Sequence, residues 1–269
     1  MSRRNLGSKI KLSSYDDMFG VNATANENVV VENQIKDVAL SELHPFKNHP
    51  FKVIDDEKMD EMVESVKQYG VLVPAIVRER AEGGYELISG HRRHHAAVLA
   101  GLEEMPVIVK NCDDDESTVI MVDANIQRED ISVSEKAKAY RMKYDAMKHQ
   151  GASGGISLAE MSESAGESRK TIQRLIYLSN LTEELLELID NKKIGIAQGV
   201  DLAFIPKEEQ DVVFCVMQKT GVYINMEQSA RIKNAVKEGL FNEQWLLEIL
   251  SYKKPPVRKV VFNQNKLDS

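Results

Sequence analysis

Residues 158–175 read LAEMSESAGESRKTIQRL, and this stretch decides the fold of the C-terminal half of the chain. Gly166 stands near its centre and permits the tight left-handed turn that joins the two helices of a helix-turn-helix. Apolar residues on both sides of Gly166 recur at helical spacing, so each flank forms an amphipathic helix that packs against the other. These apolar residues are Leu158, Met161, Ala165, Ile172 and Leu175. The stretch therefore predicts a helix-turn-helix.

Polar and basic side chains remain on the outer side of the second predicted helix, close to its N-terminus. They are Ser168, Arg169, Lys170, Gln173 and Arg174. Such side chains bind phosphate groups and base edges in the major groove of DNA. Residues 132–180 carry 8 basic and 5 acidic side chains, whereas residues 34–131 carry 11 and 20. The sequence predicts that this helix binds double-stranded DNA, although a helical hairpin with a solvated basic face has the same pattern.

The composition of the 269-residue chain excludes several classes of protein. A formal net charge of −7 at pH 7 excludes a uniformly basic nucleic-acid coat. Two cysteines, Cys112 and Cys215, are too few for a disulfide scaffold, a four-cysteine zinc site or an iron–sulfur cluster. No uncharged run approaches the ~20 residues of a membrane span, and the N-terminus lacks the apolar region of a signal peptide. We expect a soluble, cytoplasmic protein with no membrane partner.

Strand patterns are confined to the N-terminal part of the chain, where helix, hairpin, helix and strand patterns follow one another. The corresponding segments are 55–69, 71–77 with 85–88, 91–100 and 105–109. We therefore expect an α+β N-terminal domain followed by an all-α helix-turn-helix domain. The predicted organisation is a flexible arm (1–33), the α+β domain (35–130), the helix-turn-helix domain (132–180), a helical continuation (181–254) and a flexible tail (255–269).

A candidate anion site lies where the predicted hairpin enters the helix over 91–100. Gly90 lets the backbone approach a ligand there, and free N–H groups of the first helical turn attract an anion. Arg92 and Arg93 then supply two guanidinium groups that clamp phosphate. The competing interpretations are a surface arginine pair that covers carboxylates, and a metal site at His91 and His95 for which no third ligand is evident.

Taken in order along the chain, these motifs resemble the ParB family of bacterial partition proteins. The resemblance runs from about residue 35 to the 230s. It rests on GVLVP at 70–74, GHRR at 90–93, NIQRED at 125–130, SEKAKAY at 134–140 and the helix-turn-helix. The order and spacing of these motifs are specific, whereas any one of them alone is weak.

The resemblance implies a fold, ligands and partners. The N-terminal domain would be a ParB/sulfiredoxin-like domain that binds CTP, and the helix-turn-helix would bind a palindromic DNA site. The chain would form a homodimer whose two N-terminal domains close on nucleotide binding, and a ParA-type ATPase is a further possible partner. Residues that would bind the nucleotide are Gly70 and Pro74 near the base, Gly90, His91, Arg92 and Arg93 at the triphosphate, and Asn125, Gln127 and Arg128.

The sequence departs from the family's pattern at positions that bear on catalysis. His91 and Ala124 stand where the family usually has acidic residues, and carboxylates are the ligands that Mg²⁺ prefers. We therefore expect CTP binding rather than CTP hydrolysis, with Mg²⁺ as a possible further ligand. A dimerisation domain of the family's C-terminal type is not evident. The alternatives are a nuclease or phosphotransferase on the same N-terminal fold, and a transcription regulator without a nucleotide.

Overall fold

The computed structural model describes residues 34–128, 130–151 and 154–251. Within them, an α+β N-terminal domain is followed by helices alone, so the predicted fold class is confirmed. The predicted flexible arm and tail, 1–33 and 255–269, lie outside the described residues. None of the helices in the described part of the chain has the length and apolar character that a membrane crossing requires.

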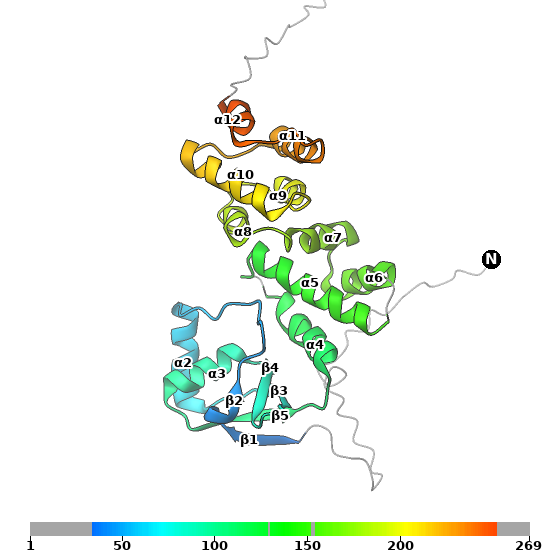
Figure 1. Ribbon diagram of the computed structural model, residues 1–269. Coiled ribbons are helices and arrows are strands. Elements are labelled where there is room, and N and C mark those ends of the chain that lie inside the picture. Colours follow the sequence, from blue (N-terminus) through cyan, green and yellow to red (C-terminus); the bar gives the residue numbers. More distant parts are fainter. Residues whose placement is uncertain (1–33, 129, 152–153, 252–269) are drawn as a thin grey trace, which may run out of the picture.

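A five-stranded mixed sheet forms the centre of the N-terminal domain (Figure 1). Its strands are β1 (Ile35–Ala39), β2 (Leu43–His44), β3 (Ala75–Glu79), β4 (Tyr85–Ser89) and β5 (Glu104–Val109). Their order in the sheet is β1-β5-β3-β4-β2, in which β3 pairs antiparallel with β4 and parallel with β5. The predicted hairpin is therefore confirmed, with Gly83 and Gly84 at positive φ in its turn.

Two features of the sheet differ from the sequence-based expectation. Strand β3 begins at Ala75 rather than at residue 71, because Pro74 has no N–H for a ladder bond and Val73 faces solvent. Strands β1 and β2 had no clear pattern in the sequence. Each lies at an edge of the sheet, where pairing with one neighbour is enough and strict apolar alternation is not required.

Helices α3 (His91–Ala100) and α4 (Asp114–Ile126) pack on the sheet, and α2 (Glu57–Tyr69) packs on α3. Leu87 and Ile88 are both buried on β4 but belong to different clusters, because successive strand residues point to opposite faces. The Leu87 face is continuous through Val71 with the cluster between α2 and α3. The Ile88 face packs against Met121 and other residues of α4. Helix α4 thus connects the sheet to the helices that follow it.

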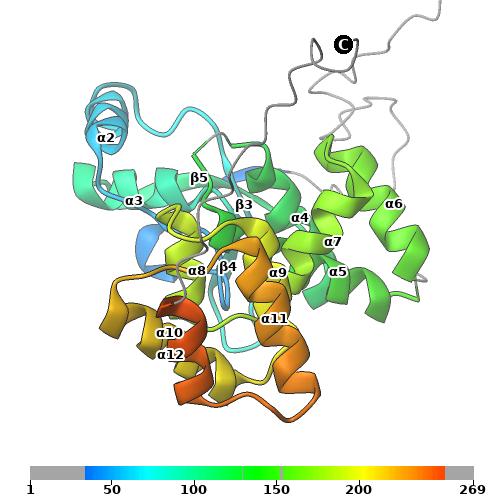
Figure 2. The same cartoon turned by 90° about the horizontal axis from the view of Figure 1, so that it is seen from above.

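The C-terminal part consists of helices stacked away from the sheet (Figures 1 and 2). They are α5 (Val133–His149), α6 (Gly154–Ala165), α7 (Arg169–Leu178), α8 (Glu183–Asp190), α9 (Ile196–Leu202), α10 (Lys207–Thr220), α11 (Met226–Lys237) and α12 (Glu243–Ser251). Helices α6 and α7 form the predicted helix-turn-helix, with Gly166 at φ 67° in the turn. One buried cluster extends from Ile88 and α4 through α5 to Leu250, so the two domains share a core.

Candidate functional site

Gly90 lies between β4 and α3 as the N-cap of α3, and its backbone conformation requires glycine. Its φ is 106°, and a Cβ at this position would lie 2.9 Å from the Cβ of Ala75. Any larger residue would be strained by its own backbone and would also push against β3. The first turn of α3 is therefore held close to the sheet, with the N–H groups of that turn at the head of the helix.

Arg92 and Arg128 line the same small cavity, although they come from the two separate motifs GHRR and NIQRED. The cavity has a volume of about 20 Å³. Its lining residues are Phe51, Lys52, Ile54, Asp56, Arg92, Arg128, Asp130, Ile131 and Glu135. Arg92 is largely buried, with a side-chain exposure of 17%. The structure therefore brings two of the predicted phosphate-binding side chains together and directs neither of them into bulk solvent.

Carboxylates bind both arginines of this cavity. Arg92 Nη2 donates to Asp56 Oδ1 at 3.2 Å, and Arg128 Nη2 donates to Asp130 Oδ2 at 3.3 Å. Burial opposes ionisation of Asp56, but the backbone N–H of Met59 and the Arg92 guanidinium outweigh it and lower the pKa of Asp56. The hydrogen bond from Arg128 lowers the pKa of Asp130. Both carboxylates are therefore anions, and each is hydrogen-bonded to a guanidinium group that could otherwise bind phosphate.

Glu135 connects the rim of the cavity to the helical domain. Its carboxylate accepts from the backbone N–H of Lys52 at 2.7 Å and from that of Ser132 at 3.0 Å. The second of these bonds belongs to a capping box that begins α5. The loop before α2 is thus fixed to the start of α5, which closes the cavity on one side.

Arg93 points to a different place from Arg92. Its Nη1 atom donates to the carbonyl oxygens of Val73 and Pro74, at 2.5 and 2.6 Å. The structure thus joins α3 to the end of the segment that runs from Gly70 to Pro74, which the sequence analysis assigned to the wall near the base. Arg93 holds this wall in place in the present conformation.

The side chain of His91 is largely buried and does not line the cavity. Its Nε2 atom accepts from the backbone N–H of Phe46 at 3.3 Å, and its ring lies against that of His49 with centroids 3.8 Å apart. Burial first, and then the charges that His49 and His94 would carry, lower the pKa of His91 to about 3. His91 is therefore a neutral acceptor that fixes the loop around Phe46.

Stability is expected to fall on acidification because of His91. The unfolded chain binds a proton at the ordinary pKa of 6.5 and the folded chain only near 3, so protons favour unfolding between these values. Going from pH 7 to pH 5 should cost about 2 kcal/mol of unfolding free energy from this one group. Urea unfolding of the wild type and of His91→Gln at both pH values measures the difference.

The exposed His149 provides the matched control for this experiment. His149→Gln should lose as much stability as the wild type between pH 7 and pH 5, whereas His91→Gln should lose less. His49 and His94 also have lowered pKa values because of burial, and both are retained in all three proteins. Equal losses in His91→Gln and the wild type would contradict the assignment.

Asn125 and Gln127 do not reach the cavity in this conformation. Asn125 Nδ2 donates to the carbonyl oxygen of Met121 within its own helix, at 2.8 Å. Gln127 Nε2 donates to the carbonyl oxygen of Ser164 in α6, at 3.0 Å. The two side chains predicted to complete the nucleotide site therefore contact helix α4 and the helix-turn-helix instead.

The outward residues of α7 stand as the sequence pattern predicts. Ile172, Leu175, Ile176 and Leu178 are buried beneath the helix. Ser168 is its N-cap and accepts from the backbone N–H of Thr171 at 3.1 Å. All five polar and basic side chains predicted to contact DNA are exposed, namely Ser168, Arg169, Lys170, Gln173 and Arg174. Gln173 also donates to the hydroxyl of Tyr177 at 3.1 Å.

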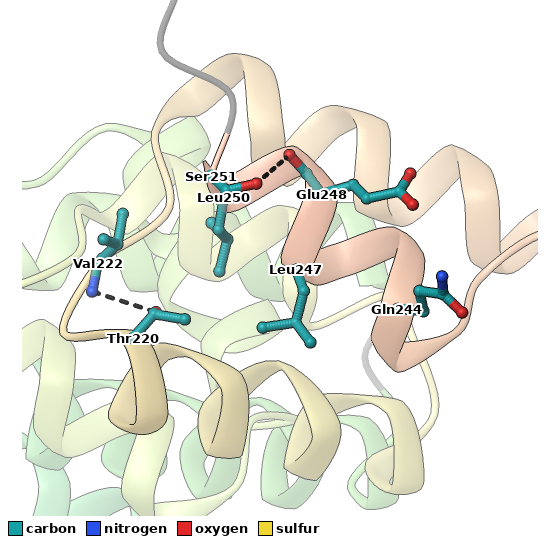
Figure 3. A pocket seen from close by; sticks show the side chains of 7 residues that line it. All are labelled: Thr220, Val222, Gln244, Leu247, Glu248, Leu250 and Ser251. Carbon is teal, nitrogen blue, oxygen red and sulfur yellow. Dashed lines mark hydrogen bonds between the residues drawn. The ribbon is translucent and has the colours of Figure 1, made fainter.

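A larger groove, of about 400 Å³, lies far along the chain between the end of α10 and α12. Figure 3 shows Leu247 and Leu250 projecting from α12 toward the end of α10. The groove is lined by Thr220, Val222, Gln244, Leu247, Glu248, Leu250 and Ser251, none of which the sequence analysis selected. The part of the chain that the structure describes contains no group of three or more His, Cys, Asp or Glu side chains that could hold a metal ion.

Several residues of the site were missed by the sequence analysis. Asp56 and Asp130 pair with the arginines, and Glu135 fixes the cavity rim. Asp56 had a local signal, because an acidic residue directly before a helix is a common N-cap. The pairing of Asp56 with Arg92 could not be predicted in that way, since the two residues are distant in the sequence.

A small α+β domain with an arginine-lined cavity, followed by a helix-turn-helix, defines a class of two-domain helix-turn-helix proteins. The chain belongs to the ParB family. Residues 24–126 match the ParB N-terminal domain and residues 129–238 match the ParB HTH domain.

Curated relatives are similar over most of the chain. A nucleoid occlusion protein of Listeria monocytogenes serotype 4a (strain HCC23) is 28% identical, over 87% of this chain and 75% of its own. Stage 0 sporulation protein J of Bacillus subtilis (strain 168) is 29% identical, over 91% of this chain and 81% of its own.

Solved ParB structures are more distant. C-terminally truncated ParB from Caulobacter crescentus, complexed to the centromeric parS site, is 20% identical with a TM-score of 0.45, over 74% of this chain and 98% of its own. The same truncated protein complexed with CTP-γ-S is 24% identical with a TM-score of 0.34, over 63% and 92%.

Proposed function

We propose that this chain is a sequence-specific DNA-binding protein of partition type, acting in segregation of a chromosome or plasmid or in related regulation, and gated by CTP in its N-terminal domain. The observation that carries the proposal is the convergence of Arg92 and Arg128 on one cavity. The chain belongs to the ParB family, and the resemblance of its motifs to that family implies CTP as the nucleotide.

Phosphate binding follows from the chemistry of this cavity. A triphosphate would take the guanidinium groups of Arg92 and Arg128 from Asp56 and Asp130, and would meet the N–H groups at the start of α3. A cavity of about 20 Å³ is far smaller than a site that holds a nucleotide. The segment that carries Arg128 must therefore move outward to admit the nucleotide and then close around its phosphates.

The proposal is for nucleotide binding rather than hydrolysis. The ring of His91 is largely buried and accepts a hydrogen bond from the backbone N–H of Phe46, and Ala124 has no ligand atom. Asp123 is the nearest alternative carboxylate along the chain, but it forms an ion pair with Lys143. The described residues near the triphosphate thus offer a divalent cation few free carboxylates beyond those that bind the arginines, and Mg²⁺ would be held mainly by the phosphates themselves.

The exposed face of α7 would enter the major groove. Its N-terminal turn carries Arg169 and Lys170, in the position from which a recognition helix contacts bases and phosphates. Relatives act in related processes by name, as a nucleoid occlusion protein and a chromosome-partitioning protein. We accordingly propose a palindromic site, a homodimer that binds it, and location at the nucleoid, with a ParA-type ATPase as a candidate partner.

Subunit crosslinking tests this function directly. Purified protein is treated with a lysine-reactive crosslinker, with and without CTP and with and without a palindromic duplex selected from a random-sequence pool. We expect the crosslinked dimer to increase only when CTP and the selected duplex are both present.

Other outcomes favour the alternatives. Specific DNA binding that CTP never alters would indicate a transcription regulator without a nucleotide. Cleavage of the duplex on addition of divalent metal, lost in His91→Ala, would indicate a nuclease. Failure of the pool to yield any preferred duplex would contradict the proposed function.

A further inference from the structure

One face of α5 carries three polar side chains into the interior. Lys136, Tyr140 and Lys143 are separated by four and three residues, so they lie above one another on the same helical face. The side chain of Lys143 is only 5% exposed, which is unusual because a lysine is almost never buried without a partner.

The ammonium group of Lys143 connects three helices. Its Nζ atom lies 2.5 Å from Asp123 Oδ1 in α4 and 3.1 Å from Ser164 Oγ in α6. The same Ser164 also accepts, through its carbonyl oxygen, the hydrogen bond from Gln127. The segment just after α4 thus contacts Ser164 directly through Gln127, and α4 itself is linked to the same residue through Lys143.

The residue that contacts Ser164 is adjacent in sequence to a residue that lines the arginine-lined cavity. Gln127 precedes Arg128, whose guanidinium lines the cavity. Because Gln127 and Arg128 are joined by one peptide bond, a displacement of Arg128 toward a bound phosphate would strain the hydrogen bond from Gln127 to Ser164. Lys143 and Asp123 would then carry the remaining connection between α4 and α6.

The opposite end of the same face reaches the start of α7. Lys136 Nζ donates to Glu167 Oε1 at 3.2 Å, and Glu167 immediately precedes Ser168, the N-cap of α7. The face formed by Lys136, Tyr140 and Lys143 therefore extends from α4 to the N-cap of α7.

The middle of this polar face is incompletely hydrogen-bonded among the residues that the structure describes. The hydroxyl of Tyr140 and Oε2 of Glu167 are buried and have no hydrogen-bond partner. Burial, and then the carboxylates of Glu167 and Asp123, raise the pKa of the Tyr140 hydroxyl. Unpaired buried polar atoms are costly, so this face can gain hydrogen bonds by a small rearrangement.

We propose that Lys143 is a positioning residue that couples the two sites: its buried contacts with Asp123 and Ser164 transmit nucleotide binding at Arg128 to the helix-turn-helix. This inference rests on the proposed function, since it requires both ligands. The coupling is reciprocal, so DNA binding changes nucleotide affinity by the same factor.

The test compares the Kd for CTP without and with the selected palindromic duplex. In the wild type we expect the two values to differ at least about fivefold. In Lys143→Met they should agree within about twofold, while the Kd for CTP without DNA stays within about threefold of wild type. Lys148→Met, which removes an exposed lysine from the same helix, should keep the wild-type ratio.

A second variant guards against misfolding, because Lys143→Met leaves Asp123 without its partner. Lys143→Met combined with Asp123→Met removes both charges and should fold, yet it should still lose the coupling. Either variant keeping the wild-type ratio would overturn the inference. A wild type that binds both ligands with a ratio of one would also overturn it and leave DNA and CTP binding standing. A wild type that binds neither ligand would overturn the proposed function itself.

Discussion

Replacing Arg169, Lys170 and Arg174 together by alanine is expected to weaken binding to the selected duplex by about 100-fold or more at constant salt. The three side chains are exposed and lie on the outer face of α7. Each would form a contact with a phosphate or a base edge, and alanine can form neither. The slope of log K against log salt should also fall in magnitude by about 3 to 5, because each of the two subunits loses three cationic side chains and fewer counterions are released.

The fold should survive these three substitutions. The apolar face of α7, which includes Ile172 and Leu175, is untouched, and alanine is a strong helix former. Lys207, Lys219 and Lys237 provide the matched control, since all three are exposed on other helices. Alanine at these positions makes the same change in net charge and should leave the affinity within about threefold. Equal losses in the two triple variants would show that net charge, and not α7, determines binding.

The helix-turn-helix could be predicted because its determinants are local. Gly166 marks the turn, and the spacing of Ile172 and Leu175 alone identifies the buried side of the second helix. The polar and basic residues of this segment must then face outward, and the structure shows that all five residues predicted to contact DNA are exposed. Interactions within a few residues of each other, such as caps and glycine turns, can be identified from one sequence.

The arginine-lined cavity could be predicted only in part. The motifs suggested Arg92 and Arg128 separately, but their convergence depends on how the loop before α2 meets the start of α5. That loop is held by Glu135, which looks from the sequence like an ordinary capping-box residue. Its second bond, to Lys52, joins residues far apart in the chain and leaves no periodic signal.

Lys143 shows the same limit more strongly. A lysine in an amphipathic helix is normally assigned to the solvent side. Helix α5 lies between α4 on one side and the helix-turn-helix on the other, so it has little free surface at Lys143. Its burial is a consequence of this tertiary arrangement and of a partner, Asp123, that belongs to another helix.

Substitutions at the cavity should change CTP affinity in opposite directions, depending on the charge they remove. Arg128→Ala is expected to weaken binding by about 10- to 100-fold, because a charge-assisted hydrogen bond to phosphate is lost. Asp56→Asn is expected to strengthen binding by up to about fivefold, because Arg92 no longer has an anionic partner to give up. Asparagine also preserves the N-cap of α2.

Isothermal titration calorimetry with CTP measures both changes in affinity, and each variant has a control with the same change in charge. Asp55→Asn makes the same charge change one residue away, where the carboxylate contacts His95 instead of an arginine. Arg80→Ala removes an arginine that pairs with Glu82 near the hairpin turn. Both controls should bind CTP as the wild type does. If Asp56→Asn weakened binding as Arg128→Ala does, Asp56 would contribute to the nucleotide site rather than compete with the phosphates for Arg92.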